Sequence, residues 1–254
     1  MNNYSITAII VNYNNNFLLK SCINSVLNQS HPVDQIIIVD DCSKNNDEIK
    51  NLIEAFDLNN IKLITNEVNV GPGKSRNIAW DYVTTEFIAF LDSDDLWHEK
   101  TIATQLEYFK KFKNYSVICG EKSNYTEQNT KYEIKNLNKN YLLFFNTIAT
   151  SSVMLRANIK QRFRNTYYAE DYYLWLNILF NKLEIGFINQ YLSYENNNSN
   201  VKNKLSNKSI KMELYIQSNF FKFYDSNILN CLTIFFAQFF SILKFLFRII
   251  RNTL

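Results

Sequence analysis

An apolar run that ends abruptly in acidic residues is the feature that most restricts the fold of this chain. Residues Phe87–Leu91 contain no polar side chain, and the next residues are Asp92, Ser93, Asp94 and Asp95. An uninterrupted apolar run of this kind is typical of a parallel strand that is buried on both faces. Open α/β sheets bind ligands beyond the carboxyl ends of such strands, so we predict that these acids lie at a ligand site.

Asp92 and Asp94 are predicted ligands of a divalent metal ion, Mg²⁺ or Mn²⁺. They lie two residues apart at the end of a strand, where both carboxylates can reach one cation. Mg²⁺ is usually held in this way, by one or two carboxylates together with phosphate groups of a substrate. A helix cap formed by Asp94 or Asp95 is the alternative, but capping accounts for only one of the three acids.

In the first half of the chain, strand-like runs alternate with segments of helical periodicity. Besides Phe87–Leu91, strands are predicted at Ile6–Val11, Gln35–Val39 and Ile61–Thr65, each followed by a helical pattern. This alternation predicts an α/β fold with a mostly parallel central sheet flanked by helices. Each strand is followed by Asn or Asp, which places these polar side chains along one edge of the sheet.

The second half of the chain has a less regular pattern. The predicted elements are a helix at Thr101–Lys113, strands at Tyr115–Cys119 and Ser151–Leu155, and a helix at Asp171–Leu183. The polar segments Glu121–Asn140 and Glu195–Ser209 are predicted to be loops.

Paired acids occur at two further places. Asp40 and Asp41 follow the second strand, where a carboxylate can accept hydrogen bonds from a nucleotide base or ribose. A turn with a helix cap at Ser43 explains them equally well.

Glu170 and Asp171 open a helix with an apolar face, and acids there commonly interact with the helix dipole. If they face a metal site, one of them can accept a proton from a substrate hydroxyl.

The segment Asn69–Asn77 contains half of the four glycines of the chain. Gly71 and Gly73 permit a tight turn and a close approach of the backbone. Lys74 and Arg76 bring positive charge to the amino end of a predicted helix, which itself favours anions. This pattern indicates phosphate binding only weakly, because a turn followed by solvated cations explains it too.

Six motifs in a characteristic order resemble the family 2 glycosyltransferases, which have the GT-A fold. The motifs are Ala8–Asn14, Leu18–Ser30, Ile37–Ser43, Asn69–Asn77, Asp92–Asp95 and Glu170–Leu176. They extend over roughly the first two thirds of the chain, and their order makes the match specific where one motif alone would be weak.

The resemblance implies roles for individual residues. The nucleotide site would consist of Val11, Asn12, Tyr13, Asp41, Gly71, Lys74, Arg76, Asn77, Asp92 and Ser93. Asp94 would bind the metal together with Asp92. Asp171 would be the general base, and Glu170 and Trp175 would position the acceptor.

The resemblance also implies an inverting, metal-dependent enzyme that transfers one hexosyl or N-acetylhexosaminyl group. The donor would be a nucleoside-diphosphate sugar, in particular a UDP-sugar. The acceptor would be a glycan or lipid-linked saccharide of a bacterial surface polysaccharide such as lipopolysaccharide, capsule or O-antigen. Processive addition is not expected, because the QxxRW motif of polysaccharide synthases is absent from the sequence.

Many family members carry an Arg after the last core strand, where this chain has Glu195. The alternatives are a membrane-attached protein with a vestigial sugar-nucleotide site and a DxD-dependent phosphotransferase.

The end of the chain, Ile228–Leu254, is predicted to form an amphipathic helix with a narrow polar stripe and a very broad apolar face. The cations Lys244, Arg248 and Arg251 gather towards its end, which favours an interfacial position on anionic lipid. A transmembrane span at Ser226–Leu243, and a helix docked on the catalytic domain or on a second copy in a homodimer, are the alternatives.

We predict three parts of the chain: a nucleotide-sugar-binding half at 1–120, an acceptor-binding half with the base at 121–200, and a helical tail at 201–254. The four scattered cysteines and an amino terminus without a signal-peptide pattern predict a cytoplasmic protein, here peripheral on the inner face of the bacterial membrane. The net charge of +3 is too small to indicate nucleic acid binding.

Overall fold

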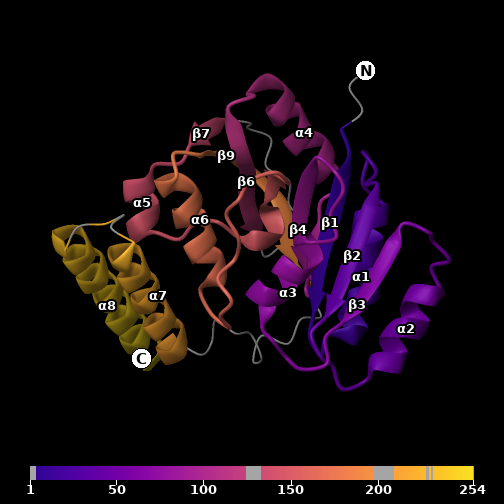
Figure 1. The fold of residues 1–254 in the computed structure, drawn as a ribbon, viewed down its shortest axis with the longest axis horizontal. Helices are drawn as coiled ribbons and strands as arrows, with labels where there is room; N and C mark the ends of the chain where they lie inside the picture. Colours follow the sequence, from indigo (N-terminus) through magenta and orange to yellow (C-terminus); the bar gives the residue numbers. More distant parts are fainter. Residues whose placement is uncertain (1–3, 124–132, 197–208, 227–228, 230, 254) are drawn as a thin grey trace.

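The computed structural model describes residues 4–123, 133–196, 209–226, 229 and 231–253 (Figure 1). The first part alternates strands and helices as predicted. Its elements are β1 (Ile6–Asn12), α1 (Asn16–Leu27), β2 (Gln35–Asp40), α2 (Asn46–Glu54), β3 (Ile61–Thr65), α3 (Pro72–Trp80) and β4 (Phe87–Asp92). The four predicted strands are confirmed to within one residue at their ends.

The second part contains short strands, the remaining helices and one long strand. Its elements are β5 (Asp95–Trp97), α4 (Thr101–Lys111), β6 (Tyr115–Ser123), β7 (Ile134–Asn136), α5 (Lys139–Phe144), a 3-10 helix (Thr150–Ser152), β8 (Met154–Arg156), α6 (Glu170–Phe180), β9 (Glu184–Glu195), α7 (Ser209–Asp225) and α8 (Cys231–Thr253). The helix predicted at 101–113, the helix predicted at 171–183 and the strand predicted at 115–119 are confirmed.

Three predictions for the second part need correction or lie outside the described residues. The strand predicted at Ser151–Leu155 begins only at Met154, because a 3-10 turn precedes it. The predicted loop Glu121–Asn140 contains β7 and the start of α5, and its residues 124–132 lie outside the described part. Most of the predicted loop Glu195–Ser209 also lies outside it. The sequence pattern does not predict β9, because polar residues such as Asn189 and Gln190 interrupt its apolar run.

The nine strands that the structure describes belong to one sheet, in which β3, β2, β1, β4, β8, β6, β9 and β5 are neighbours in this order and β7 pairs with β9. The strands β1 to β4 are parallel to one another, as predicted. The other half is mixed, because β8 runs antiparallel to β4 and β6, and β5 and β7 run antiparallel to β9. The predicted domain boundary at residue 120 falls within β6, so both predicted halves share this sheet.

The alternating side chains of the buried strands fill two hydrophobic cores. On β1, the even-numbered Ile6, Ala8 and Ile10 pack in a cluster with residues of α1 and α4. Ile9 belongs to the opposite cluster, which also contains residues of α3, α5, α6, α7 and α8. Burial on both faces explains why the parallel strands are apolar runs instead of alternating patterns.

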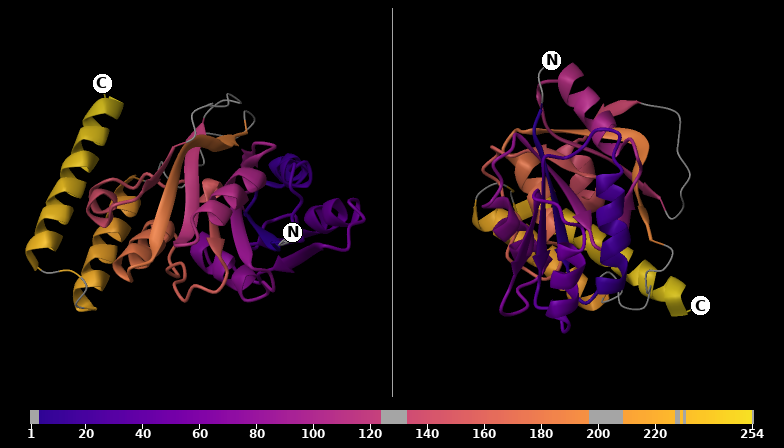
Figure 2. Two further views of the ribbon diagram at one scale, coloured as in Figure 1. Left: turned by 90° about the horizontal axis from the view of Figure 1, so that it is seen from above. Right: turned by 90° about the vertical axis from the view of Figure 1, so that its right-hand side faces the viewer.

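The helices α7 and α8 pack against each other at one end of the molecule, and α8 also contacts α5 (Figure 2). The side of α8 that faces the protein is narrow and contains Ile234, Ala237 and Ser241, which are all buried. The opposite side carries large apolar side chains that are 44–72% exposed. We call these residues the apolar face of α8; they are Leu232, Phe235, Phe236, Phe239, Ile242, Leu246 and Phe247.

Two residues of the polar stripe of α8, Ser241 and Lys244, point towards the protein. Lys244, which was predicted to face lipid, donates a hydrogen bond from Nζ to the carbonyl oxygen of Phe144 in α5. Its ammonium group also lies over the rings of Phe145 and Phe240. The prediction for Lys244 is wrong, because this side chain fastens α8 to α5. Among the helices that the structure describes, none is long and apolar enough to cross a membrane.

Candidate active site

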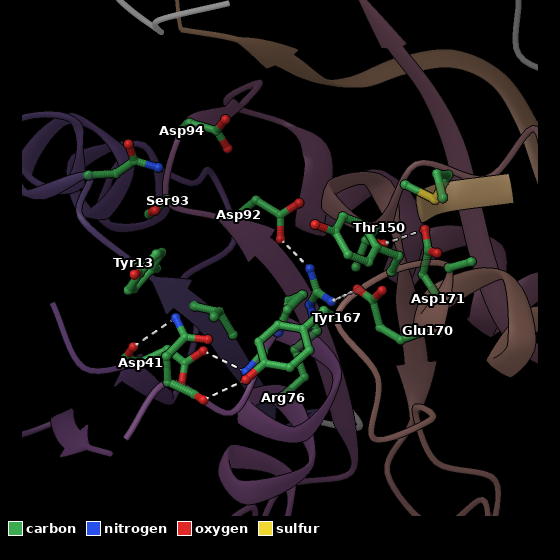
Figure 3. Close-up of a pocket in the computed structure, with 18 of the residues that line it drawn as sticks. Tyr13, Asp41, Arg76, Asp92, Ser93, Asp94, Thr150, Tyr167, Glu170 and Asp171 are labelled. Carbon is green, nitrogen blue, oxygen red and sulfur yellow. Dashed lines mark hydrogen bonds and ion pairs between the residues drawn. The ribbon is translucent and has the colours of Figure 1, made fainter. Parts of the chain in front are cut away.

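The polar residues at the ends of the parallel strands meet at one edge of the sheet, as predicted. Asn12 of β1 pairs in register with Asp40 of β2, and Val11 pairs with Asp92 of β4. A cavity of about 570 Å³ opens beside this edge (Figure 3). Ligand sites usually have volumes of roughly 300–1,000 Å³. The cavity is lined by Val11, Tyr13, Asn15, Asp41, Asn69, Gly71, Pro72, Arg76, Asp92, Ser93, Asp94, Lys122, Thr150, Tyr167, Tyr168, Ala169, Glu170, Asp171 and Met212.

The three acids that follow the apolar run point in two directions. Asp92 and Asp94 line the cavity. Asp95 begins β5, is only 2% exposed, and accepts hydrogen bonds from Lys122 Nζ at 2.7 Å and from the Ser151 hydroxyl. Burial raises the pKa of Asp95 to about 7, although the neighbouring Lys122 ammonium acts to lower it.

The acids at the end of β4 fit a metal ion that is shared with a substrate. Among the described residues, no three His, Cys, Asp or Glu side chains come together to form a complete set of metal ligands. Asp92 and Asp94 supply the carboxylates that Mg²⁺ and similar ions use when phosphate and water complete their coordination. Asp92 Oδ1 accepts a hydrogen bond from Arg76, so a metal would share Asp92 with this residue.

Arg76 of α3 connects the two acidic segments of the cavity (Figure 3). Its Nη2 donates to Asp92 Oδ1 at 2.6 Å, and its Nη1 donates to Glu170 Oε1 at 2.8 Å. The guanidinium group also lies 5.1 Å from the ring centre of Phe163. Burial disfavours the charged form, but the carboxylates of Asp92 and Glu170 outweigh this effect and raise the pKa of Arg76. Arg76 therefore remains a cation that holds both acids.

Glu170 and Asp171 enter the cavity from the first turn of α6. Burial and the nearby Asp171 raise the pKa of Glu170 to about 7, although Arg76 acts to lower it. Burial also raises the pKa of Asp171. The Asp171 carboxylate accepts hydrogen bonds from the Tyr172 N–H at 2.6 Å and from the Thr150 hydroxyl at 3.4 Å. The two acids of α6 thus differ in their partners: Glu170 forms an ion pair with Arg76, whereas Asp171 accepts hydrogen bonds from Tyr172 and Thr150.

The glycines of the predicted phosphate loop allow α3 to approach α6. A Cβ atom at Gly73 would collide with the carbonyl oxygen of Arg164 and would lie 2.7 Å from Glu170 Cγ. Gly71 has φ of +86°, and a Cβ atom there would lie 3.0 Å from the ring of Tyr167. Without side chains at these positions, the start of α3 packs directly against the segment that leads into α6. This packing brings Arg76 within reach of Glu170.

Asp41, a predicted base-binding residue, also orders this glycine loop. Its Oδ1 accepts hydrogen bonds from the Val70 N–H at 2.8 Å and from Asn66 Nδ2 at 2.9 Å. Its Oδ2 accepts a hydrogen bond from the Gly71 N–H at 2.8 Å. The side chain is buried at the wall of the cavity, so it fixes the backbone that surrounds a ligand.

Four predicted site residues do not line the cavity. Lys74 is exposed, because two residues along a helix lie about 200° apart and Arg76 points inward. Asn77 exchanges hydrogen bonds with the backbone of residue 163 and therefore braces α3. Asn12 is buried and donates to the acid that ends β2. Trp175 is completely buried in the core beneath α6 and does not reach the cavity.

The structure also brings unpredicted residues to the cavity, namely Asn15, Lys122, Thr150, Tyr167, Tyr168 and Met212. Tyr167 and Tyr168 directly precede the acids of α6, and this proximity in the sequence could have identified them. Lys122 lies in a segment that was predicted to be a loop, and Met212 belongs to α7, so neither carries a local signal.

The mixed sheet with an acidic cavity at the ends of its parallel strands is the architecture expected of the GT-A class, and comparison with known proteins gives the family. The family model described as "Glycosyl transferase family 2" matches residues 7–168. The Escherichia coli protein WfgD, named UDP-Glc:alpha-D-GlcNAc-diphosphoundecaprenol beta-1,3-glucosyltransferase, is 32% identical over 206 residues, which cover 74% of this chain and 76% of WfgD. The chain therefore belongs to the family 2 glycosyltransferases.

Solved structures with a similar fold include two glycosyltransferases. Staphylococcus aureus TarS 1–349 in complex with UDP-GlcNAc matches with a TM-score of 0.66 and 18% identity, covering 85% of this chain and 66% of that one. The mannosyltransferase PcManGT from Pyrobaculum calidifontis, in complex with GDP-Man and Mn²⁺, matches with a TM-score of 0.66 and 15% identity, covering 86% and 64%. At these identities the similarity concerns the fold, and it confirms the predicted GT-A fold.

Proposed function

We propose that the protein transfers one hexose or N-acetylhexosamine from a UDP-sugar to a lipid-linked saccharide, with inversion at the anomeric carbon. The product would be a precursor of a bacterial surface polysaccharide. The observation that carries this proposal is the shared cavity, in which the acids after β4 and the acids of α6 face one another and are joined by Arg76. The names of the relatives support the substrates, since WfgD is named for a UDP-Glc donor and a diphosphoundecaprenol-linked acceptor.

The donor nucleotide would occupy the part of the cavity beside β1, β2 and α3. Tyr13 is 49% exposed at the wall and offers a ring on which a base can stack. Asp41 would fix the neighbouring glycine loop and accept a hydrogen bond from the base. A divalent cation held by Asp94 and Asp92, either Mn²⁺ or Mg²⁺, would neutralise the charge that develops on the leaving diphosphate.

Asp171 is the proposed general base. Its carboxylate is held by Thr150 and by the backbone N–H of Tyr172, and its raised pKa makes it a stronger base than an ordinary aspartate. A general base acts by accepting the proton of the acceptor hydroxyl as the oxygen attacks. Attack from the side opposite the diphosphate inverts the anomeric configuration. Glu170 is paired with Arg76 and would position the acceptor and the start of α6.

A donor screen tests this function. Purified protein with Mn²⁺ or Mg²⁺, a panel of nucleoside-diphosphate sugars and a short-chain GlcNAc-diphosphate lipid should release nucleoside diphosphate with one UDP-sugar. Mass spectrometry should find one added sugar and no polymer, and NMR of the product should show the inverted anomer. The Asp171→Asn protein is the matched control. Failure of every donor to react, together with failure of UDP to bind, would support the vestigial-site alternative instead.

We also propose that the apolar face of α8 rests on an anionic membrane surface, on the inner face of the cytoplasmic membrane. This face exposes a large continuous apolar surface, which we expect to associate with a partner instead of remaining in water. Arg248 and Arg251 follow this face in the sequence. A cation close to an anionic membrane adds about 1 kcal/mol to the binding of the protein to that membrane. A lipid-linked acceptor would then be presented to an enzyme that already lies on the membrane.

Vesicle flotation tests the membrane proposal. A Phe235→Glu/Phe239→Glu protein should float with phosphatidylglycerol vesicles much less than the unaltered protein, with no loss of thermal stability, because both rings are more than half exposed. The control is Phe17→Glu, which alters a side chain of α1 that is 59% exposed. Equal flotation of all three proteins would refute the proposal. Concentration-dependent dimerisation without flotation would show that a second copy covers the face.

A further inference from the structure

Lys122 is a cation of the cavity to which the proposed mechanism gives no role. It lies near the end of β6, where β6 pairs with β9 and β9 pairs with β5. Its Nζ atom lies 2.7 Å from the Asp95 carboxylate and 3.9 Å from Glu195 Oε1. The side chain is 26% exposed and lines the cavity together with Asp92 and Asp94. Three strands therefore hold one ammonium group next to the proposed metal site.

The charges that line the cavity are strongly unbalanced. The described wall contains five carboxylates and two cations: Asp41, Asp92, Asp94, Glu170, Asp171, Arg76 and Lys122. Both ends of the Arg76 guanidinium are occupied by carboxylates. A diphosphate that enters this space needs positive charge from the protein as well as from a metal ion, and Lys122 is the cation on the side of Asp94.

The surroundings of Lys122 keep it charged and in place. Burial disfavours its ammonium form, but Asp95, Asp92 and Asp94 outweigh this effect and raise its pKa. Asp95 is itself fixed by the hydroxyl of Ser151. Many family members carry an Arg where this chain has Glu195, and the structure places the Glu195 carboxylate beside Lys122. The positive charge at this edge of the cavity thus comes from β6.

We propose that Lys122 binds the diphosphate of the nucleotide donor and product, and that Asp95 and Glu195 position its ammonium group. The inference rests on the proposed use of a nucleoside-diphosphate sugar. A hydrogen bond from a charged donor to a phosphate oxygen is short and strong. Losing it should therefore weaken the binding of UDP but not of uridine, which has no phosphate.

The experiment measures the affinities of UDP and uridine by calorimetry, with Mn²⁺ present, for the unaltered protein and the Lys122→Met variant. The variant should bind UDP about 10- to 100-fold more weakly, which corresponds to the loss of one charged hydrogen bond, and should bind uridine with unchanged affinity. Lys122→Arg should recover much of the lost affinity. Lys74→Met removes an exposed charge of α3 outside the cavity and should bind UDP normally.

A second variant separates binding from folding, since Lys122→Met leaves Asp95 buried without its cation. Asp95→Asn/Lys122→Met removes both charges and should restore the melting temperature without restoring the affinity for UDP. If the double variant recovers both, or if Lys122→Met binds UDP like the unaltered protein, Lys122 has only a structural role and the inference is refuted. Absence of UDP binding to the unaltered protein would instead refute the proposed function.

Discussion

Replacing Arg76 by Met tests whether the two acidic segments of the cavity depend on this one cation. The Arg76 side chain is 6% exposed and contacts Asp92 at 2.6 Å and Glu170 at 2.8 Å. The Glu170 side chain is 9% exposed, whereas that of Asp92 is 35% exposed. Loss of Arg76 therefore leaves Glu170 as a buried acid without a cation, while water can solvate Asp92.

The expected loss of stability is large and depends on pH. Removing one partner of a buried ion pair costs about 3–5 kcal/mol. With Arg76 present, the pKa of Glu170 is raised, chiefly by burial, to about 7. A raised carboxyl pKa means that the folded state holds a proton that the unfolded state releases, so stability falls as the pH rises from the unfolded pKa to the folded pKa.

In the variant the pKa of Glu170 should rise further, so stability should keep falling above pH 7, where the fall levels off in the unaltered protein. The free-energy difference between the two proteins should therefore be about 1 kcal/mol larger at pH 8 than at pH 7. Adding Glu170→Gln to the variant should remove this pH-dependent difference, because no ionisable group then remains at the position.

Urea unfolding followed by tryptophan fluorescence measures these values, since Trp80, Trp97 and Trp175 are all buried. Lys74→Met is the control, because it removes an exposed cation from the same helix and should change stability by less than about 0.5 kcal/mol. A variant that is as stable as the unaltered protein at pH 8, or that becomes relatively more stable as the pH rises, would refute the reasoning.

Three further variants test individual residues of the cavity. Asp94→Ala should abolish turnover and the Mn²⁺-dependent part of UDP affinity without unfolding the protein; full activity of this variant in the presence of a chelator would contradict the metal assignment. Asp171→Asn should lower kcat by about 10²–10⁴ with little change in UDP binding, and Glu170→Gln should lower it less. A reversal of these two effects in steady-state assays would exchange the roles of the acids. Gly73→Ala should reduce the free energy of unfolding by about 1–3 kcal/mol through overcrowding against Glu170, and unaltered urea unfolding would contradict this packing.

The sequence by itself determined the parallel half of the sheet and the position of its acids. Phe87–Leu91 could be identified as a buried strand because burial on both faces requires an apolar side chain at every position. The carboxyl ends of parallel strands lie at the same edge of a sheet. The sequence therefore also predicted the edge at which Asp92 lies. The resemblance to the family placed Asp171 at the same site, although it lies 79 positions after Asp92 in the sequence.

Only the tertiary structure decided which neighbouring side chains face the cavity and what they contact. Asp95 turns away from the cavity and pairs with Lys122 because β5 and β6 meet on β9, a strand that its mixed sequence did not predict. Likewise, the sequence revealed the two unequal sides of α8, but contacts with α5 and α7 determined that Ser241 and Lys244 of its polar side face inward. A periodic pattern defines the sides of a helix or strand, whereas the side that becomes buried depends on partners far away in the sequence.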